Sequence, residues 1–128
     1  LPRLMTDLGQ LIVGAVDGVL GHMDLRWYPE HAMCVVMASR GYPGAHETGG
    51  EVRGIDAAEE DASVTVFHAG TELRDGRIVA VGGRVLGVTG RGATLAEARD
   101  RTYAAVDKID WPGGFCRRDI GWRALGRR

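Results

Sequence analysis

Apolar residues recur at spacings of three and four near the start of the chain, in the stretch Leu4–Leu20. This spacing puts them on one side of an α-helix, so the pattern predicts an amphipathic helix over the whole stretch. A second helix is predicted after Thr94, because Thr94 and Glu97 have the spacing of a capping box, in which each side chain accepts a hydrogen bond from the other's backbone N–H. That helix is expected to end near Lys108 or Ile109.

Short apolar segments separated by turn residues lie between these helices, a pattern typical of strands. The segments predicted as strands are Ala32–Ser39, Val52–Ile55, Val64–Leu73, Arg77–Val81 and Arg84–Thr89. The pair Asp75-Gly76 favours a tight hairpin turn, because both residues readily adopt positive φ. Phe115, Ile120 and Trp122 are expected to pack the C-terminal tail against the body. The order of elements predicts an α+β domain, an antiparallel strand meander with flanking helices.

Length and composition fit one globular domain. The 128 residues are 45% hydrophobic and carry a formal net charge of −1. Such a charge supplies no long-range field for nucleic acid, and no apolar run is long enough to cross a bilayer. We therefore expect neither nucleic acid nor a membrane as a partner. The first residue is Leu rather than Met, from which we expect the chain to be a piece of a longer protein.

The two cysteines, Cys34 and Cys116, lie far apart and have no disulfide or zinc-site spacing. This usage favours a reducing, cytoplasmic setting. Cys34 stands in an apolar run and is expected to be buried. Cys116 precedes Arg117 and Arg118, a neighbourhood that can lower the pKa of a thiol, although an unreactive thiol is the simpler interpretation.

Two glycine-rich stretches, Gly82-Gly83-Arg84 and Gly87–Gly92, are candidates for ligand contact. Neither has the spacing of a P-loop or of a dinucleotide fingerprint, and turns or bulges explain the glycines equally well. His68, three residues before Thr71, is either a general base or phosphate contact, or a histidine hydrogen-bonded within the fold. The four histidines share no metal-ligand spacing. No nucleophile elbow is present.

Four motifs follow one another along the chain: Met37–Gly44, Phe67–Thr71, Gly82–Thr89 and Asp119–Ala124. In this order and spacing, with the capped helix between the last two, they resemble the C-terminal region of the phosphoribosylamine–glycine ligases. That family, also called the glycinamide ribonucleotide synthetases, belongs to the ATP-grasp ligases. The likeness covers nearly the whole chain.

The resemblance implies an enzyme of de novo purine biosynthesis that uses ATP to join glycine to 5-phosphoribosylamine, giving glycinamide ribonucleotide. In this family ATP activates the glycine carboxylate as an acyl phosphate, Mg²⁺ neutralises the phosphates, and a closed site keeps water away. The family's metal-binding residues lie upstream of the first residue here. The resemblance therefore implies no catalytic or metal-binding residue in this chain, no tightly bound cofactor, and no activity of the chain alone.

The same resemblance divides the chain into two parts. Residues 1–31 correspond to the end of the ATP-grasp core, a helix and a linker. Residues 32–128 correspond to the C-terminal domain, which in the family resembles half of a barrel-sandwich hybrid and caps the active site. The implied partners are the N-terminal ATP-grasp core, glycine and 5-phosphoribosylamine. Without that core, an apolar surface and above all the first helix are expected to be exposed, and two copies of the chain can dimerise there.

The substrate-binding candidates that the motifs imply are Gly41, Tyr42, Pro43, His68, Thr71, Gly82, Gly83 and Arg84. Arg84 suits the ribose phosphate, because a guanidinium binds phosphate through two parallel hydrogen bonds. A purely structural role stays equally open for the glycines. The alternative function is a stand-alone anion- or nucleotide-binding interaction module. It would use the basic end of the chain, which consists of Arg117, Arg118, Arg123, Arg127 and Arg128. A self-sufficient small enzyme is the third reading, but no nucleophile, base or metal cluster supports it.

Overall fold

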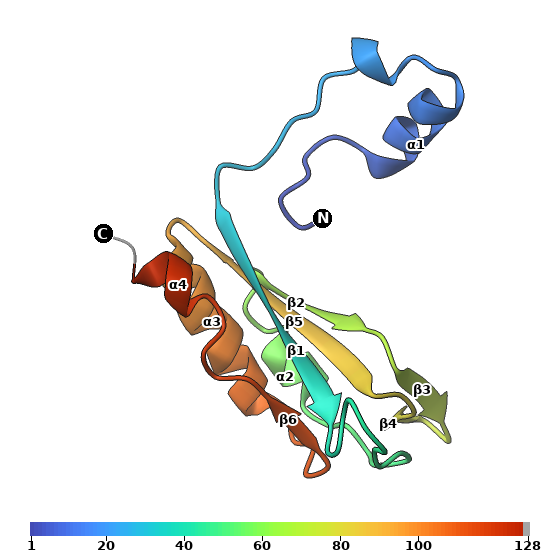
Figure 1. The fold of residues 1–128 in the computed structure, drawn as a ribbon, viewed down its shortest axis with the longest axis vertical. Coiled ribbons are helices and arrows are strands. Elements are labelled where there is room, and N and C mark those ends of the chain that lie inside the picture. Colours follow the sequence, from blue (N-terminus) through green and yellow to red (C-terminus); the bar gives the residue numbers. More distant parts are fainter. Residues whose placement is uncertain (127–128) are drawn as a thin grey trace.

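The structure, a computed structural model that describes residues 1–126, consists of a body and an N-terminal arm (Figure 1). The arm, residues 1–30, contains helix α1 (Leu8–Val16) and the 3-10 turn η1 (Leu20–His22), and it extends away from the body. The body begins with strand β1 (His31–Ser39). Arg127 and Arg128, which belong to the basic end, lie outside the described residues.

A four-stranded antiparallel sheet with the order β2-β5-β1-β6 forms the centre of the body. Its other strands are β2 (Val64–His68), β5 (Arg84–Gly92) and β6 (Gly114–Cys116). The α+β class with antiparallel strands and flanking helices is confirmed. The predicted strand order, that of a simple meander, is not confirmed, because no two neighbouring strands of this sheet are consecutive in the sequence. β1 and β5, the two longest strands, pair along nearly their whole length.

A separate hairpin is formed by β3 (Thr71–Arg74) and β4 (Arg77–Ala80). Its turn consists of Asp75 and Gly76, as the sequence predicts, with φ of 49° and 75°. Positive φ at both central residues is the geometry that matches the twist of the flanking strands.

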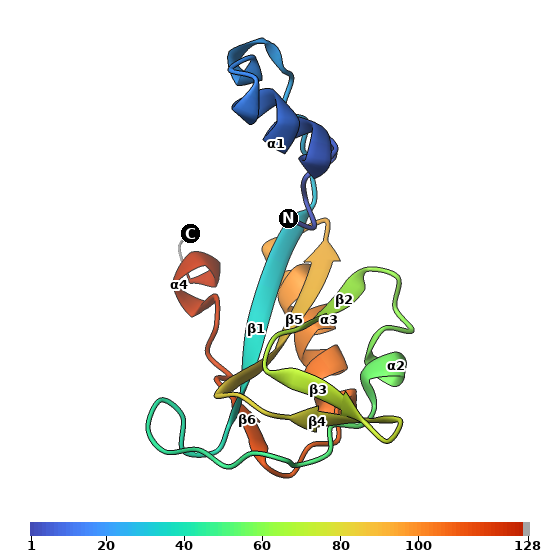
Figure 2. The same ribbon diagram turned by 90° about the vertical axis from the view of Figure 1, so that its right-hand side faces the viewer.

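Helix α3 (Leu95–Lys108) covers one face of the four-stranded sheet (Figure 2). Its N-cap is Thr94, as predicted, whose hydroxyl accepts from the N–H of Glu97 at 3.1 Å. The helix lies close to β5 because Gly90 has no side chain: a Cβ there would be 2.6 Å from the Thr102 hydroxyl. That hydroxyl accepts a hydrogen bond from the Gly90 N–H at 3.0 Å. It donates another to a backbone carbonyl one turn earlier in α3, at 2.7 Å. The buried oxygen is therefore fully paired.

The core lies between α3 and the sheet. On β1 it contains the alternate residues Met33, Val35 and Met37, all buried. Leu86 and Val88 of β5 pair with Met37 and Val35 and are buried as well. Because side chains alternate along a strand, the residues between these positions point to the opposite face of the sheet.

Two of the predicted strands are wrong in detail. Val52–Ile55 is not a strand, but an extended stretch with isolated bridges that leads into helix α2 (Ile55–Ala58). Val64–Leu73 is two strands rather than one, because the chain bends at Gly70. A Cβ on Gly70 would lie 2.8 Å from the Cα of Gly82, so the two backbones approach where only glycine fits.

The C-terminal tail is anchored less firmly than predicted. Ile120 packs against the core, but Phe115 is 44% exposed and Trp122 is 59% exposed. Trp122 begins the short helix α4 (Trp122–Leu125), which stands beside the body in Figure 1. Of the three predicted anchors, only Ile120 has this role.

The helix of the arm is shorter than the predicted Leu4–Leu20. It starts after Asp7, whose carboxylate accepts from a backbone N–H of the first turn at 2.8 Å, the N-cap interaction. It ends before Gly18, which has a φ of 71°. Leu4 instead forms an isolated bridge with Trp27, which closes the base of the arm.

The apolar side of α1 is exposed, as expected for a helix without its packing partner. Ile12, Val13 and Val16 are 56%, 59% and 82% exposed. Only Leu11 and Gly14 of this helix are buried, and a Cβ on Gly14 would collide with Met23 of the same arm.

Candidate functional site

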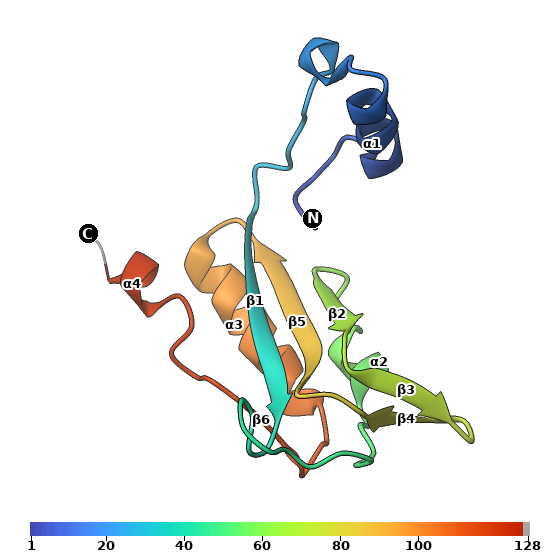
Figure 3. The same cartoon turned by 45° about the vertical axis from the view of Figure 1, so that its right-hand side comes forward.

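The sheet face opposite α3 carries no helix within residues 1–126 (Figures 2 and 3). We call it the open face and define it by Cys34, Val36, Phe67 and Phe115. These side chains come from β1, β2 and β6, and Val36 and Phe67 lie in one row across Gly87 of β5. Val36, Phe67 and Phe115 are 45%, 43% and 44% exposed. A contiguous exposed apolar surface of this kind marks an interaction site.

One end of the open face is hollowed into a pocket of about 350 Å³, the open-face pocket. Its walls include Val36 and Phe115 of the open face together with Tyr42, Arg84 and Ile120. Two of the predicted substrate-binding residues, Tyr42 and Arg84, therefore come together here from distant parts of the sequence. Mostly apolar walls with one or two charged groups are typical of a site for a small organic anion.

The loop after β1 positions Tyr42. The buried Ser39 holds the base of the loop, since its hydroxyl donates to the Gly82 carbonyl at 2.7 Å and its N–H donates to the Gly83 carbonyl at 2.8 Å. Gly41 has a φ of 95°, and a side chain there would collide with a backbone carbonyl. A side chain on Gly83 would collide with the Tyr42 ring. These glycines permit the close backbone approach that places Tyr42 at the pocket.

His68 and Thr71 form a pair beside this corner. The His68 Nδ1 and the Thr71 Oγ1 are 3.0 Å apart. The N–H of Gly70, between them, donates to the Arg84 carbonyl at 3.0 Å. Neither side chain is among the described residues that line the open-face pocket, and neither is Pro43, which is exposed in the loop after β1.

Two arginines, Arg84 and Arg117, line the open-face pocket. Arg117 is held by Asp119 through hydrogen bonds of 2.9 and 2.6 Å. These bonds lower the pKa of the Asp119 carboxyl. Within residues 1–126 Arg84 has no carboxylate partner, so its charge is available to a bound anion.

Sequence reasoning missed Phe115 and Arg117 as walls of this pocket. Phe115 was expected to pack against the body, and Arg117 counted only toward the basic end of the chain. The Arg117-x-Asp119 spacing could have indicated a site residue. A carboxylate two residues away can hold an arginine side chain in one orientation by hydrogen bonds. No local pattern indicated that Tyr42 and Phe115 meet.

The two cysteines differ in their surroundings. Cys34 is exposed, so the prediction that it is buried is wrong. It occupies an alternate position of β1, and the alternation assigns it to the open face. Burial raises the pKa of the Cys116 thiol, while the charge of Arg118 opposes this effect. This agrees with the interpretation of Cys116 as an unreactive thiol.

We expect iodoacetamide at pH 8 to alkylate Cys34 at least about tenfold faster than Cys116. Only an accessible thiolate reacts, and Cys116 is less exposed and has a thiol whose pKa is raised by burial. Peptide mass spectrometry after timed quenching measures both rates in one sample. The variants Cys34→Ser and Cys116→Ser, each with one thiol left, serve as matched controls. Equal rates at the two thiols would contradict the surroundings described above.

Metal-ligating side chains do not gather in the part of the chain that is described: residues 1–126 contain no group of three His, Cys, Asp or Glu able to hold an ion. The helices of the same residues include none with the length and apolar character needed to cross a membrane.

Comparison with known proteins adds to this geometry. Residues 32–123 match the family described as phosphoribosylglycinamide synthetase, C domain. The chain is 56% identical over 125 residues to the phosphoribosylamine–glycine ligase of Mesorhizobium japonicum, covering 98% of this chain and 29% of that protein. It is 52% identical over 128 residues to the chloroplastic phosphoribosylamine–glycine ligase of Arabidopsis thaliana. That match covers 98% of this chain and 24% of the Arabidopsis protein.

A solved structure is similar as well. The crystal structure of phosphoribosylamine–glycine ligase from Thermotoga maritima superposes with a TM-score of 0.65 at 34% sequence identity. The match covers 84% of this chain and 27% of the Thermotoga chain. The chain thus spans between 24% and 29% of the length of these proteins.

Proposed function

Because the chain belongs to the phosphoribosylglycinamide synthetase family, through its C domain, we propose that it is the C-terminal part of an ATP-dependent ligase joining glycine to 5-phosphoribosylamine. In this proposal the chain caps an active site that the N-terminal remainder of the enzyme supplies, and it is inactive alone. Residues 1–31 then end the ATP-grasp core and residues 32–128 form the C-terminal domain. The family match, which starts at residue 32, supports this division.

The open face is the observation that carries the proposal. α3 covers one side of the sheet, while Val36, Phe67 and Phe115 leave the other side apolar and close to half exposed. Removing apolar surface from water is favourable by about 25 cal/mol per Å², and part of this gain is offset by the entropy lost on association. The proposed cover is the ATP-grasp core, because the relatives are three to four times longer than this chain, as their coverage of 29% and 24% implies.

The arm supports the same proposal. Its exposed residues Ile12, Val13 and Val16 form a second apolar surface, on the part of the chain assigned to the core. A helix with a large exposed apolar side is normally packed against another element. In the intact ligase the rest of the core would cover it. A second copy of the chain is the other possible cover, so dimerisation of the chain alone is part of the proposal.

Within the cap, the open-face pocket is the proposed substrate contact. The free charge of Arg84 fits the phosphate of 5-phosphoribosylamine, and the Tyr42 ring and Phe115 form an apolar wall beside it. Three of the other candidates, Gly41, Gly82 and Gly83, act by shaping the backbone. His68 and Thr71 lie farther along the same corner and could contact substrate only if it extends beyond this pocket.

ATP and Mg²⁺ are proposed as cofactors of the intact ligase, where they activate the glycine carboxylate. The donor sets of residues 1–126 do not fit a metal ion, so no step through Mg²⁺ is assigned to residues of this chain. A reducing compartment such as the cytoplasm is proposed because both described cysteines are free thiols.

The test is reassembly of activity. The chain is mixed with the N-terminal part of the Mesorhizobium ligase that lies outside the matched 125 residues, and ADP release from MgATP is followed with glycine and fresh 5-phosphoribosylamine. We expect no glycine-dependent ADP release from either piece and clear release from the mixture. Cys34 should become protected from iodoacetamide in the mixture, because docking covers the open face.

The Mesorhizobium ligase split at the same point is the control that shows whether two such pieces reassemble. If that pair works and the pair containing this chain does not, the proposal is wrong. ADP release by the chain alone would also overturn it. Tight binding of ribose 5-phosphate by the chain, without reassembly and without protection of Cys34, would favour the stand-alone anion-binding module.

A further inference from the structure

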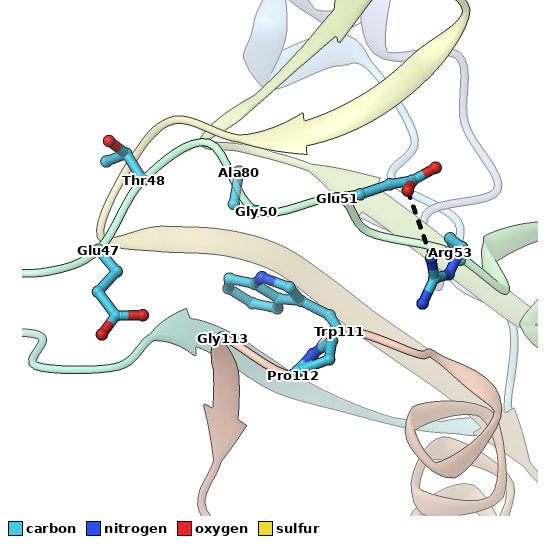
Figure 4. A pocket seen from close by; sticks show the side chains of 9 residues that line it. All are labelled: Glu47, Thr48, Gly50, Glu51, Arg53, Ala80, Trp111, Pro112 and Gly113. Carbon is cyan, nitrogen blue, oxygen red and sulfur yellow. Dashed lines mark hydrogen bonds and ion pairs between the residues drawn. The ribbon is translucent and has the colours of Figure 1, made fainter.

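A second pocket, of about 370 Å³, lies away from the open face, between the loop after β1 and the turn that precedes β6 (Figure 4). We call it the Trp111 pocket. Its lining includes Glu47, Gly50, Glu51, Trp111 and Gly113. Figure 4 shows the indole of Trp111 between the loop segment with Glu47 and Glu51 and the turn with Gly113. The ligase proposal assigns no role to this site.

Trp111 presents an unused hydrogen-bond donor there. The side chain is part of the core and only 6% exposed. A buried indole N–H normally has an acceptor, but none of the described residues accepts from this one. Every fully buried side-chain nitrogen or oxygen within residues 1–126 has a hydrogen-bond partner. The indole nitrogen of Trp111 has none among these residues, so it is not fully buried. The N–H therefore faces the open space of the pocket.

Two glycines keep the approach to this donor clear. The indole nitrogen would lie 3.4 Å from a Cβ on Gly50 and 3.3 Å from a Cβ on Gly113. A side chain at either position would stand directly beside the N–H and occupy the space that an acceptor needs. The donor is thus accessible because both of its lining neighbours lack side chains.

Charge around the pocket is negative in sum. Glu47 has no cation within ion-pair distance among residues 1–126. Glu51 pairs with Arg53 at 3.3 Å, but Asp110 holds the same guanidinium at 2.6 and 2.9 Å. Arg40, which donates to the Pro112 carbonyl at 3.1 Å, adds a second positive charge at the edge. The charged side chains that line the pocket itself are two carboxylates and one guanidinium group, a negative sum that favours a cationic ligand.

We propose that the Trp111 pocket binds a small organic ammonium ion that carries a hydrogen-bond acceptor next to its amino group, the chemistry of amino amides and amino alcohols. The ammonium group lies against the carboxylate of Glu47, because Figure 4 shows Glu51 on the other side of the indole with its carboxylate turned toward Arg53. The acceptor takes the hydrogen bond from Trp111. A neutral or anionic molecule of the same size lacks the first interaction and is disfavoured.

Glycinamide is a suitable probe, because it has an ammonium group and a carbonyl acceptor two bonds apart, and acetamide is its neutral counterpart. The indole N–H signal of Trp111 in a ¹H–¹⁵N NMR spectrum of the chain reports the contact directly. The variants Trp27→Phe and Trp122→Phe, both at exposed positions, assign the signals. We expect a saturable shift of the Trp111 signal with glycinamide, with a dissociation constant on the order of 1 mM.

Acetamide at the same concentrations should leave the Trp111 signal unchanged. Glu47→Gln should weaken glycinamide binding about tenfold, since it removes one charge from the ligand's ammonium group. Glu72→Gln, which removes an exposed carboxylate of the β3–β4 hairpin that pairs with Arg74, should not alter it. The proposal is overturned if glycinamide gives no saturable shift, if acetamide binds equally well, or if Glu47→Gln and Glu72→Gln have the same effect.

Discussion

Replacing Leu86 with alanine is expected to lower the free energy of unfolding by about 3 kcal/mol. Leu86 is 1% exposed and lies opposite Met37 in the layer between the sheet and α3. Truncation removes the buried Cγ and its two methyl groups and leaves a cavity, because β1 and β5 are held in register by their ladder and cannot close it. Urea unfolding followed by circular dichroism measures the change.

Leu73→Ala is the matched control, because it deletes the same atoms from a side chain that is 68% exposed. We expect that variant to stay within about 0.5 kcal/mol of the parent. A loss of less than about 1 kcal/mol for Leu86→Ala would mean that the sheet is not packed on α3 as described. The dependence of the unfolding free energy on urea should be unchanged in both variants, since the surface exposed on unfolding is the same.

Val36→Glu is expected to abolish the glycine-dependent ADP release that the mixture with the Mesorhizobium N-terminal part restores. Val36 stands at the centre of the open face, so docking would bury the new carboxylate without a partner. An unpaired buried charge costs several kcal/mol, enough to reduce assembly at least about a hundredfold. In the free chain Val36 is 45% exposed, and the carboxylate there stays in water.

Ala104→Glu supplies the control for charge. Ala104 is exposed on α3, on the other side of the sheet from the open face, and the substitution changes the net charge by the same amount. We expect Ala104→Glu to reassemble normally, and both variants to unfold within about 1 kcal/mol of the parent. Equal loss of activity in both would place the docking surface elsewhere. Full activity of Val36→Glu would remove the open face from the proposal.

Leu86→Ala tests the packing of the core, and Val36→Glu tests the surface that is proposed to dock on the N-terminal part. Leu86 and Val36 lie on neighbouring strands of one sheet and differ only in the face to which they point. One face is closed by α3 and the other is open. A chain that folds as described should therefore lose stability through the first substitution and assembly through the second.

Local chemistry determined several elements from the sequence alone. The turn at Asp75 and Gly76 was predictable because its positive φ values depend only on those two residues. The start of α3 at Thr94 was equally predictable, since the cap joins residues three apart. The four motifs likewise indicated the family, because their residues and spacing are properties of the sequence itself.

The tertiary structure decided what depends on distant partners. Cys34 and Val35 are both apolar neighbours on β1, and only the position of α3 makes the second buried and the first exposed. The bend at Gly70 exists because Gly82, in the connection between β4 and β5, approaches it closely. Tyr42 and Arg84 line one pocket because β1 pairs with β5, a pairing that no periodicity specifies. Short-range preferences are encoded residue by residue, whereas burial and site geometry arise only when segments far apart in the sequence compete to cover the same surface.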